Sequence, residues 1–245
     1  MTAPVFLTEP GGLAHDTVVL SGPEGRHAAT VRRLVAGEAV HVVDGAGTRA
    51  RCVVGAVGKD RVTLEVRDRV HEPSPTPRIT VVQALPKGDR GELAVEVMTE
   101  AGVDAIVPWA AQRCVTRWKA ERAEKSLNKW RATAREAAKQ ARRSWVPEVA
   151  GLASTRDVVA LLSSAALGVV LHEEAEERLA ALALPTDPAG GIVVVVGPEG
   201  GISDPELAAF TQAGAVPALL GHTVLRTSTA GVAALAVLQA RCGRW

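Results

Sequence analysis

The sequence is poor in cysteine. Its three cysteines, Cys52, Cys114 and Cys242, are odd in number, far apart and in no CxxC spacing. This usage argues against a disulfide framework and against a zinc cage. We therefore expect a protein of a reducing compartment, the cytoplasm.

Long apolar runs are also missing. The longest nearly uninterrupted one, residues 158–171, is broken by Ser163 and Ser164 and is shorter than the roughly 20 residues of a membrane helix. Residues 1–9 show no basic region followed by an apolar one, so no secretory signal is visible. We expect no membrane partner. The 245 residues, 47% of them hydrophobic, can build one large domain or two modest ones.

Several enzyme signatures do not occur in the chain. The phosphate-binding patterns GxxxxGK[ST] and GxGxxG are absent, which disfavours a nucleoside triphosphate and a dehydrogenase. The absence of GxSxG argues against a nucleophilic serine. No HExxH, DxDxD or paired carboxylates point to a metal or to glycosidase chemistry, so we expect no metal. Once these classes are excluded, we expect an enzyme that uses an adenosine-type cofactor and acts on a polyanion.

Positive charge is concentrated in one segment of a chain whose net charge is only +1. Residues 113–143 contain 11 Lys and Arg but only three Glu, a net charge of +8. Such an excess is typical of a phosphate-backbone contact. A solvated helix face with pairs such as Glu121 and Lys125 is the alternative, but three acids cannot pair 11 bases. We therefore predict contact with nucleic acid.

Three prolines in residues 73–77 predict an extended linker between two domains. Residues 1–72 contain short β-rich runs separated by glycine-rich turns, which predicts a small antiparallel sheet or barrel. One helix is predicted at residues 25–35, with His27, Val31 and Leu34 on one side.

Residues 78–245 alternate apolar strand runs with helical periods. The predicted strands are residues 79–85, 105–109, 167–171, 192–196 and 216–220. The predicted helices are residues 92–101, 120–142, 173–182, 204–213 and 229–241. Gly102 reads as a helix C-cap, and Ser203 as an N-cap before Pro205. The alternation predicts an α/β domain with a parallel central sheet covered on both faces.

Ligands of open α/β sheets bind beyond the carboxyl ends of the strands. Three loops leave such ends, at residues 171–174, 197–201 and 221–229. Glycines in the second loop allow a ligand to approach the backbone closely. A tight turn is the alternative interpretation of that loop, and a structural role is the alternative for His172 in the first.

At this point the residues resemble a known family, the SPOUT-superfamily 16S rRNA uridine-N3 methyltransferases, the RsmE family. Five motifs occur in the family's order along nearly the whole chain. They are His27, Val31, Arg33, Gly37, Asp44 and Gly45; residues 83–88 (QALPKG) with 100–103 (EAGV) and Pro108; residues 136–143 (EAAKQARR) with Val146 and Pro147; residues 197–201 (GPEGG); and Leu220, Gly221 and residues 224–227 (VLRT).

The resemblance implies an N-terminal PUA-like β-barrel over residues 1–72 that helps hold RNA, then, after the linker, a SPOUT α/β domain over residues 78–245 with a deep trefoil knot at about residues 168–240. Its implied activity is methylation, from S-adenosylmethionine, of N3 of a specific uridine of 16S rRNA, uridine 1498 in standard numbering, in the small ribosomal subunit. The family also works as a homodimer, and the apolar helix at residues 230–240 is a reasonable contributor to that interface.

The resemblance also assigns site residues. The implied cofactor contacts are Leu171, His172, Gly197, Glu199, Gly201, Leu220, Gly221, Leu225 and Arg226. The expected RNA contacts are Arg33, Lys87, Arg113, Arg117, Gln140, Arg142 and Arg143. The chain departs from the family at three positions: Val5 precedes Phe6 where an arginine is frequent, Ser228 replaces a glutamate, and Glu173 replaces a proline.

Methylation at N3 of uracil requires loss of the imide proton, so the enzyme must stabilise developing negative charge or accept that proton. We assign the first task, as catalytic residues, to Arg226 and Arg143; Glu199 and His172 are weaker candidates for a base. Two alternatives remain: a SPOUT methyltransferase acting on another RNA site, and a non-catalytic RNA-binding or ribosome-assembly factor.

Overall fold

The computed structural model describes residues 3–245, which fall into two compact units. The first unit comprises the chain up to Ser74 together with Ala138–Val146. The second comprises Pro75–Ala137 and Pro147–Trp245. The first unit therefore includes a short segment that lies far beyond the proline linker in the sequence.

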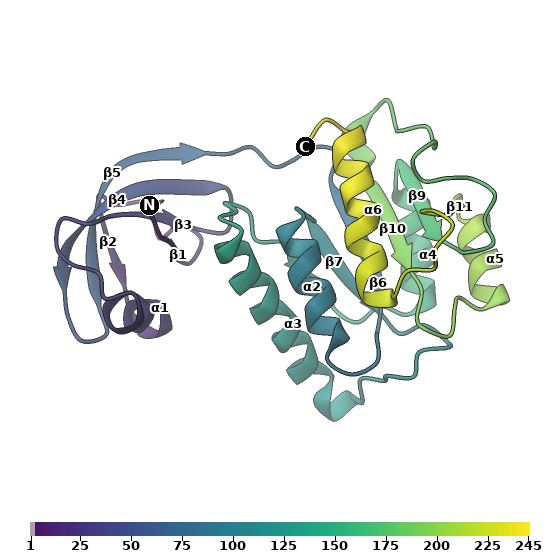
Figure 1. Cartoon of the computed structure of the whole chain (residues 1–245), viewed down its shortest axis with the longest axis horizontal. Helices are drawn as coiled ribbons and strands as arrows, with labels where there is room; N and C mark the ends of the chain where they lie inside the picture. Colours follow the sequence, from purple (N-terminus) through teal and green to yellow (C-terminus); the bar gives the residue numbers. More distant parts are fainter. Residues whose placement is uncertain (1–2) are drawn as a thin grey trace. The chain divides into compact units, whose positions relative to one another are not determined.

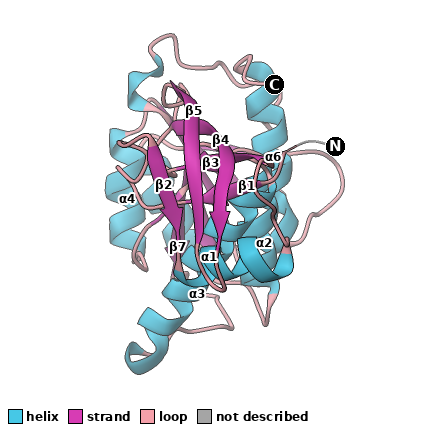
Figure 2. Cartoon of the chain, turned by 90° about the vertical axis from the view of Figure 1, so that its left-hand side faces the viewer, coloured by secondary structure: helices cyan, strands magenta, loops and turns pink. Residues whose placement is uncertain are grey.

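The described residues of the first unit form a curled five-stranded sheet in the order β1-β3-β4-β5-β2 (Figure 2). β1 pairs with β3 in parallel, and the other neighbours are antiparallel. Its strands are β1 Val5–Leu7, β2 Thr17–Leu20, β3 Ala39–Val43, β4 Thr48–Val57 and β5 Val62–His71. The alternation of buried and exposed residues confirms the predicted small β domain, whose core includes Phe6, Val40 and Leu64.

The observed helix is shorter than the one predicted at residues 25–35 and begins earlier in the chain. α1 spans Gly22–Arg26, with a proline in its first turn, and continues as a π-helical turn over His27–Val31. Arg33 then adopts a φ of 53°, which ends the helix. Val31 is 66% exposed whereas Leu34 is buried, so the prediction that both lie on one side of a helix is wrong.

Backbone pairing and a buried ion pair hold residues 138–146 in the first unit. The Lys139 ammonium lies 2.8 Å from the Glu24 carboxylate, and their side chains are only 6% and 17% exposed. The N–H of Val146 donates to the carbonyl of Gly45, and the Trp145 indole N–H donates to the carbonyl of Glu72. This segment ends the long helix α3, Ala120–Gln140, which begins in the second unit.

The described residues of the second unit form a six-stranded, fully parallel sheet in the order β11-β9-β10-β6-β7-β8 (Figure 1). The strands are β6 Ile79–Ala84, β7 Ala105–Trp109, β8 Glu148–Val149, β9 Leu167–Leu171, β10 Ile192–Val196 and β11 Val216–Ala218. The helices besides α3 are α2 Arg90–Glu100, α4 Thr155–Ser164, α5 Asp204–Gln212 and α6 Thr227–Arg241, with a 3₁₀ turn at Pro188–Gly190.

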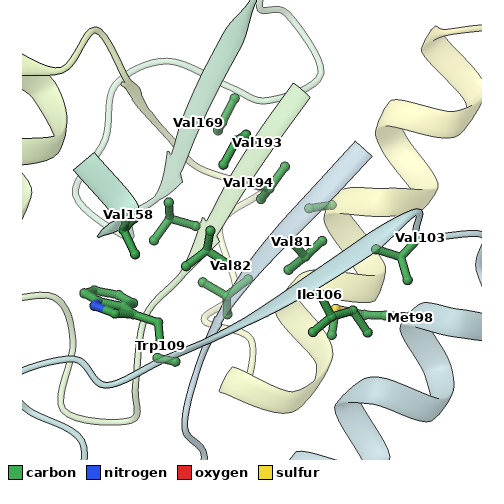
Figure 3. Packing of buried hydrophobic residues seen from close by; sticks show 14 of the residues in the cluster. Val81, Val82, Met98, Val103, Ile106, Trp109, Val158, Val169, Val193 and Val194 are labelled. Atoms are coloured by element: carbon green, nitrogen blue, oxygen red, sulfur yellow. The ribbon is translucent and has the colours of Figure 1, made fainter. Parts of the chain in front are cut away.

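Both faces of this sheet are covered, as the continuous apolar strands predict. α2 packs against α6 and α4 packs against α5, and the two pairs lie on opposite faces (Figures 1 and 2). Figure 3 shows Met98 beside Ile106 on one face, and Trp109 and Val158 on the other. Every residue of β10 is buried, so this strand forms the centre of the core. The predicted parallel α/β domain is confirmed.

Two caps appear where the sequence predicts them. Gly102 follows α2 with a φ of 91°, as a C-cap requires. Ser203 precedes α5, and both its N–H and its hydroxyl donate to the Glu206 carboxylate, at 3.2 and 2.7 Å. The contact from the Ser203 N–H is the Glu206 half of the capping box that starts α5.

The helix predicted at residues 173–182 is wrong, because that segment forms turns and bends and pairs at one residue with the segment after β11. Arg178 forms a parallel β-bridge with Leu219, and Leu179 is completely buried. A helix that the sequence pattern did not predict, α4, precedes β9 instead. Among the described residues, no helix combines the length and the apolar character needed to cross a membrane.

Candidate active site

The three predicted ligand loops meet at one edge of the parallel sheet. β11, β9 and β10 are neighbours, and their carboxyl ends lie at Ala218, Leu171 and Val196. The register aligns Ala218 with Leu171, and Val195 with Val170, so the strands end at the same level. The loops that follow them therefore start side by side, where a ligand of an open α/β sheet binds.

The loop after β10, residues 197–201, is a tight turn that glycine makes possible. A β-carbon on Gly197 would lie 2.8 Å from Cγ1 of Ile202, and Gly201 adopts a φ of 73°. The N–H of Gly201 donates to the carbonyl of Pro198 at 2.9 Å. A side chain at either glycine would therefore disturb the loop, while Glu199 and Gly200 remain exposed.

Arg113, expected to contact RNA, lies against this loop. Its Nη1 donates to the carbonyl of Gly200 at 3.5 Å and to that of Ile202 at 3.3 Å. The Arg113 side chain is still 47% exposed, and its guanidinium lies 4.0 Å from Asp204. The structure thus gives Arg113 a role in bracing the loop that the charge pattern did not indicate.

Two carboxylates, that of Glu199 in the loop after β10 and that of Glu206 in the first turn of α5, connect segments at this edge. The Lys87 N–H donates to Oε1 of Glu199 at 3.1 Å, which ties the turn after β6 to this loop. Glu206 is only 5% exposed, and its Oε1 accepts from the N–H of Gln112 at 2.8 Å and from the hydroxyl of Thr155 at 3.0 Å. The sequence analysis missed Gln112 and Thr155, since nothing in their spacing reveals contacts over 94 and 51 residues.

The loops after β9 and β11 are joined by backbone hydrogen bonds. The N–H of His172 donates to the carbonyl of Ala218 at 3.0 Å, and that of Leu179 donates to the carbonyl of Leu219 at 2.9 Å. Nδ1 of His172 accepts from the N–H of Glu174 at 3.3 Å. His172 therefore shapes its loop, and in the neutral ring the proton resides on Nε2.

The segment from Gly221 to Arg226 is exposed and offers open space. A β-carbon on Gly221 would meet no atom within 4 Å, and Leu225 is 39% exposed. The Arg226 carbonyl accepts from the N–H groups of Thr229 and Ala230, which starts α6. Within residues 3–245, the Arg226 guanidinium has no hydrogen-bond or ion-pair partner. It is therefore available to a ligand.

This arrangement fits S-adenosylmethionine. Backbone N–H and carbonyl groups of the three loops, two of which contain glycine, can read the adenine edge and the ribose, and Leu220 and Leu225 offer apolar contacts. The open space at Gly221 leaves room for the ligand. Ser228, which replaces the family's glutamate, is only 3% exposed in the first turn of α6.

Thiol chemistry has no support at this edge. Burial raises the pKa of the Cys114 thiol, and the nearby Glu199 and Glu206 carboxylates also raise it, so Cys114 stays protonated at neutral pH. In the first unit, burial raises the pKa of the Cys52 thiol on β4 to about 11. In the described part of the chain, no group of three or more His, Cys, Asp or Glu side chains could hold a metal ion.

The expected RNA contacts and the proposed catalytic pair are divided between the units. Lys87, Arg113, Arg117 and the proposed catalytic Arg226 belong to the second unit. The others, Arg33, Gln140, Arg142 and the second proposed catalytic residue, Arg143, belong to the first.

A basic cluster in the first unit was not foreseen. Nη2 of Arg49 donates to the carbonyl of Arg142 at 2.8 Å, and Arg51 pairs with Asp68. Partial burial lowers the pKa of His41, and the positive charges of Arg49, Arg142 and Arg51 lower it further. His41 is thus neutral at pH 7 in a basic surface.

Comparison with known proteins agrees with this geometry. Residues 72–239 match the RNA methyltransferase domain family, and residues 20–67 match the RNA methyltransferase PUA domain family. The ribosomal RNA small subunit methyltransferase E of Mycobacterium bovis is 48% identical over 231 residues, 93% of this chain and 87% of the relative. The Bacillus subtilis protein of the same name is 29% identical over 91% of this chain and 89% of its own length.

Two solved structures share the fold along the whole chain. One, from Neisseria gonorrhoeae, is a ribosomal RNA small subunit methyltransferase E bound to S-adenosylmethionine, with a TM-score of 0.86, 29% identity and 98% coverage of both chains. The other is a Legionella pneumophila methyltransferase in complex with the same cofactor, with a TM-score of 0.87, 26% identity and 98% coverage of both chains. The chain therefore belongs to the RNA methyltransferase family whose members include the ribosomal RNA small subunit methyltransferases E.

Proposed function

We propose that this protein transfers the methyl group of S-adenosylmethionine to N3 of a uridine of 16S rRNA, uridine 1498 in standard numbering. The observation that carries the proposal is the convergence of three loops, two of them containing glycine, at the carboxyl ends of β11, β9 and β10, in a chain 48% identical to a ribosomal RNA small subunit methyltransferase E. The cofactor contacts follow the resemblance: Leu171, His172, Gly197, Glu199, Gly201, Leu220, Gly221, Leu225 and Arg226.

The reaction replaces the N3–H bond of uracil by an N3–CH₃ bond while the bond between the methyl group and the sulfonium sulfur breaks, and it releases a proton and S-adenosylhomocysteine. S-adenosylmethionine, when bound, supplies an electrophilic methyl group on a sulfonium. The exposed guanidinium of Arg226 stabilises the negative charge that develops on O2 and O4 as N3 loses its proton. The loops supply most of the rate by holding the reacting atoms in line. Arg143 is the second proposed cation at the base or at an adjacent phosphate.

The proposal also covers the domain boundaries, the oligomeric state and the location of the reaction. The PUA-like domain corresponds to residues 1–72, the linker to 73–77 and the SPOUT domain to 78–245, with the knot at about residues 168–240. Half-buried Ala230, Val232 and Val237 on α6 support a homodimer interface along residues 230–240. We place the reaction in the cytoplasm, on the small ribosomal subunit.

The test is transfer of labelled methyl to small subunits that lack the modification, with naked 16S rRNA in parallel and the product nucleoside identified. We expect 3-methyluridine at one site. Methylation of a different nucleoside would favour another RNA target. Absence of both transfer and cofactor binding would favour a non-catalytic RNA-binding or assembly factor.

Variants of Arg226 test its assignment. Arg226→Ala should lower kcat by about 100-fold or more, as expected for loss of a group that stabilises developing charge, and Arg226→Lys should recover part of it. Arg156→Ala, a change of an exposed arginine on α4, is the matched control. A folded Arg226→Ala enzyme that methylates at the native rate would remove Arg226 from the mechanism.

A further inference from the structure

A pocket of about 480 Å³ lies in the second unit, outside the three cofactor loops. It is lined by the turn after β6, the start of α2, the segment before α3 and the first turns of α3. Its volume falls within the ~300–1,000 Å³ of small-ligand sites. We name it the Trp118 pocket, after the half-buried Trp118 in its wall.

Aromatic side chains form one part of the wall. The rings of Trp118 and Trp130 lie 5.2 Å apart at an interplanar angle of 85°, an edge-to-face pair. Trp130 is buried, and Gly91 makes room for it, since a β-carbon there would lie 2.9 Å from Cζ2 and Nε1 of the Trp130 indole. Because the ring planes are nearly perpendicular, the pair does not cover both faces of both rings.

The charged wall is cationic. Four cations line the pocket, Arg117, Lys119, Arg122 and Lys129, together with two acids, Glu92 and Glu121. Lys129 is paired with Glu92 at 2.9 Å. Within residues 3–245, no ion pair is found for Arg117, Lys119 or Arg122, all of which are exposed. The pocket therefore offers three available positive charges beside an indole.

The pocket adjoins the cofactor loops without being part of them. Pro86 and Gly88 line it, and Lys87 between them donates its N–H to Glu199 in the loop after β10. Both features lie beyond the carboxyl ends of strands of the same parallel sheet. A chain that presents one base at the cofactor loops can place a neighbouring nucleotide here.

We propose that the Trp118 pocket binds a nucleotide of the substrate RNA that flanks the methylated uridine, with its base stacked on Trp118 and its phosphates held by Arg117, Lys119 and Arg122. Aromatic faces next to cations are the recognition chemistry of single-stranded nucleic acid. The inference rests on the proposed function for the identity of the RNA, but RNA binding is measurable without methyl transfer.

The first experiment measures binding of labelled single-stranded oligoribonucleotides of about ten nucleotides to the full chain. Trp118→Ala should weaken binding about 5- to 150-fold, the range for loss of one base stack, and Trp118→Phe should retain most of the affinity. Trp245→Ala, which removes a 66% exposed tryptophan outside the pocket, should bind like the native protein. Native affinity of a folded Trp118→Ala variant would overturn the proposal.

A charge variant tests the phosphate contacts independently of the tryptophans. Arg122→Gln should reduce the slope of log K against log salt by about 0.7, the value for one phosphate contact on a single strand. Lys125→Gln, on the same helix but outside the pocket, should change it less. Equal slopes for both variants would overturn the proposal, as would competition by polyglutamate with no competition by unlabelled RNA.

Kinetics on small subunits separate this inference from the proposed function. Trp118→Ala should raise KM for the subunit and leave kcat within about 2-fold, since a flanking nucleotide contributes binding shared by ground and transition states. A fall in kcat at unchanged KM would overturn the assignment to a flanking nucleotide. Trp118-dependent RNA binding in a protein that transfers no methyl would reject the proposed function and retain the pocket.

Discussion

Gly231, in the second turn of α6, packs tightly against Met98 of α2. A β-carbon there would lie 2.6 Å from Sδ of Met98 and 3.5 Å from Oε1 of Gln83. Met98 and Gln83 are completely buried, so neither can move into solvent. Glycine at this position has a lower helix propensity than alanine, but it allows the two helices to pack closely.

Gly231→Ala is therefore expected to destabilise the protein. The helix-propensity gain of about 1 kcal/mol is opposed by an overpacking cost of about 1–3 kcal/mol. Chemical denaturation of the two proteins measures the difference. Combining it with Met98→Ala, which removes the opposing sulfur, should cost less than the sum of the two single changes. A stabilised Gly231→Ala protein would show that the helices separate at no cost.

Individual site residues were predictable only where a motif fixes a local geometry. The glycines of residues 197–201 are such a case, since a positive φ and a missing side chain are properties of the residue itself. The bracing by Arg113 and the carboxylate of Glu206 depend on contacts across 87 to 94 residues, which spacing does not encode. Trp118 was missed because its partner, Trp130, lies 12 positions away on a helix that begins between them.

At the scale of the elements, the start of α4 depends on a capping box. The N–H of Asp157 donates to the Ser154 hydroxyl at 3.3 Å, and the Asp157 carboxylate accepts from the N–H and hydroxyl of Ser154 at 2.8 and 2.7 Å. Ser154→Ala should lower the free energy of unfolding by about 1 kcal/mol. The control Ser163→Ala, later in the same helix, should change the free energy of unfolding by less. Equal effects of the two substitutions in denaturation experiments would contradict the role of the cap.

The same cap makes part of the stability depend on pH. Hydrogen bonds from Ser154 lower the pKa of Asp157 below its ordinary value of 3.8. Because the native pKa is lower than the unfolded one, this stabilisation is complete above about pH 4 and is lost as the pH falls through the native pKa. Asp157→Asn should therefore reduce the loss of stability between pH 5 and 2, roughly the titration range of the carboxyl. Unfolding curves that fall equally steeply in both proteins would contradict this.

Helices and strands were predictable where the sequence pattern of the segment alone determines its structure. β10 was found because five consecutive valines and isoleucines suit a buried parallel strand. The helix prediction for residues 173–182 was wrong because tertiary contacts, such as the bridge between Arg178 and Leu219, override the acidic, helix-favouring composition of the segment. The Ser154 and Asp157 capping box is the signal that could have located α4.

At the scale of the whole molecule, Lys139 supplies the buried ion pair that helps to hold residues 138–146 in the first unit. Lys139→Met leaves the Glu24 carboxylate largely buried without its partner and should cost about 3 kcal/mol. Lys129→Met breaks an exposed pair with Glu92 and should cost about 1 kcal/mol or less. Denaturation of both variants tests this ranking, which equal losses would contradict.

The net charge of +8 in residues 113–143 predicts electrostatic binding of RNA by the molecule. Affinity for 16S rRNA should fall steeply between about 50 and 200 mM salt as counterions are displaced from phosphates. Filter binding over this range measures the slope. An affinity insensitive to salt would show that the basic segment is only a solvated helix face.

The order of the parallel sheet also has a consequence for synthesis of the protein. β6 pairs with β10, and Ile79 lies beside Ile192, which the ribosome adds 113 residues later. At about 5–20 residues per second, roughly 6 to 23 s separate the two. During that time the nascent β6 can pair with β7 but not with β10, and the loop of residues 197–201 has not yet been made. The cofactor site is therefore among the last parts of the chain to assemble, and slow folding with a transiently open strand edge is expected.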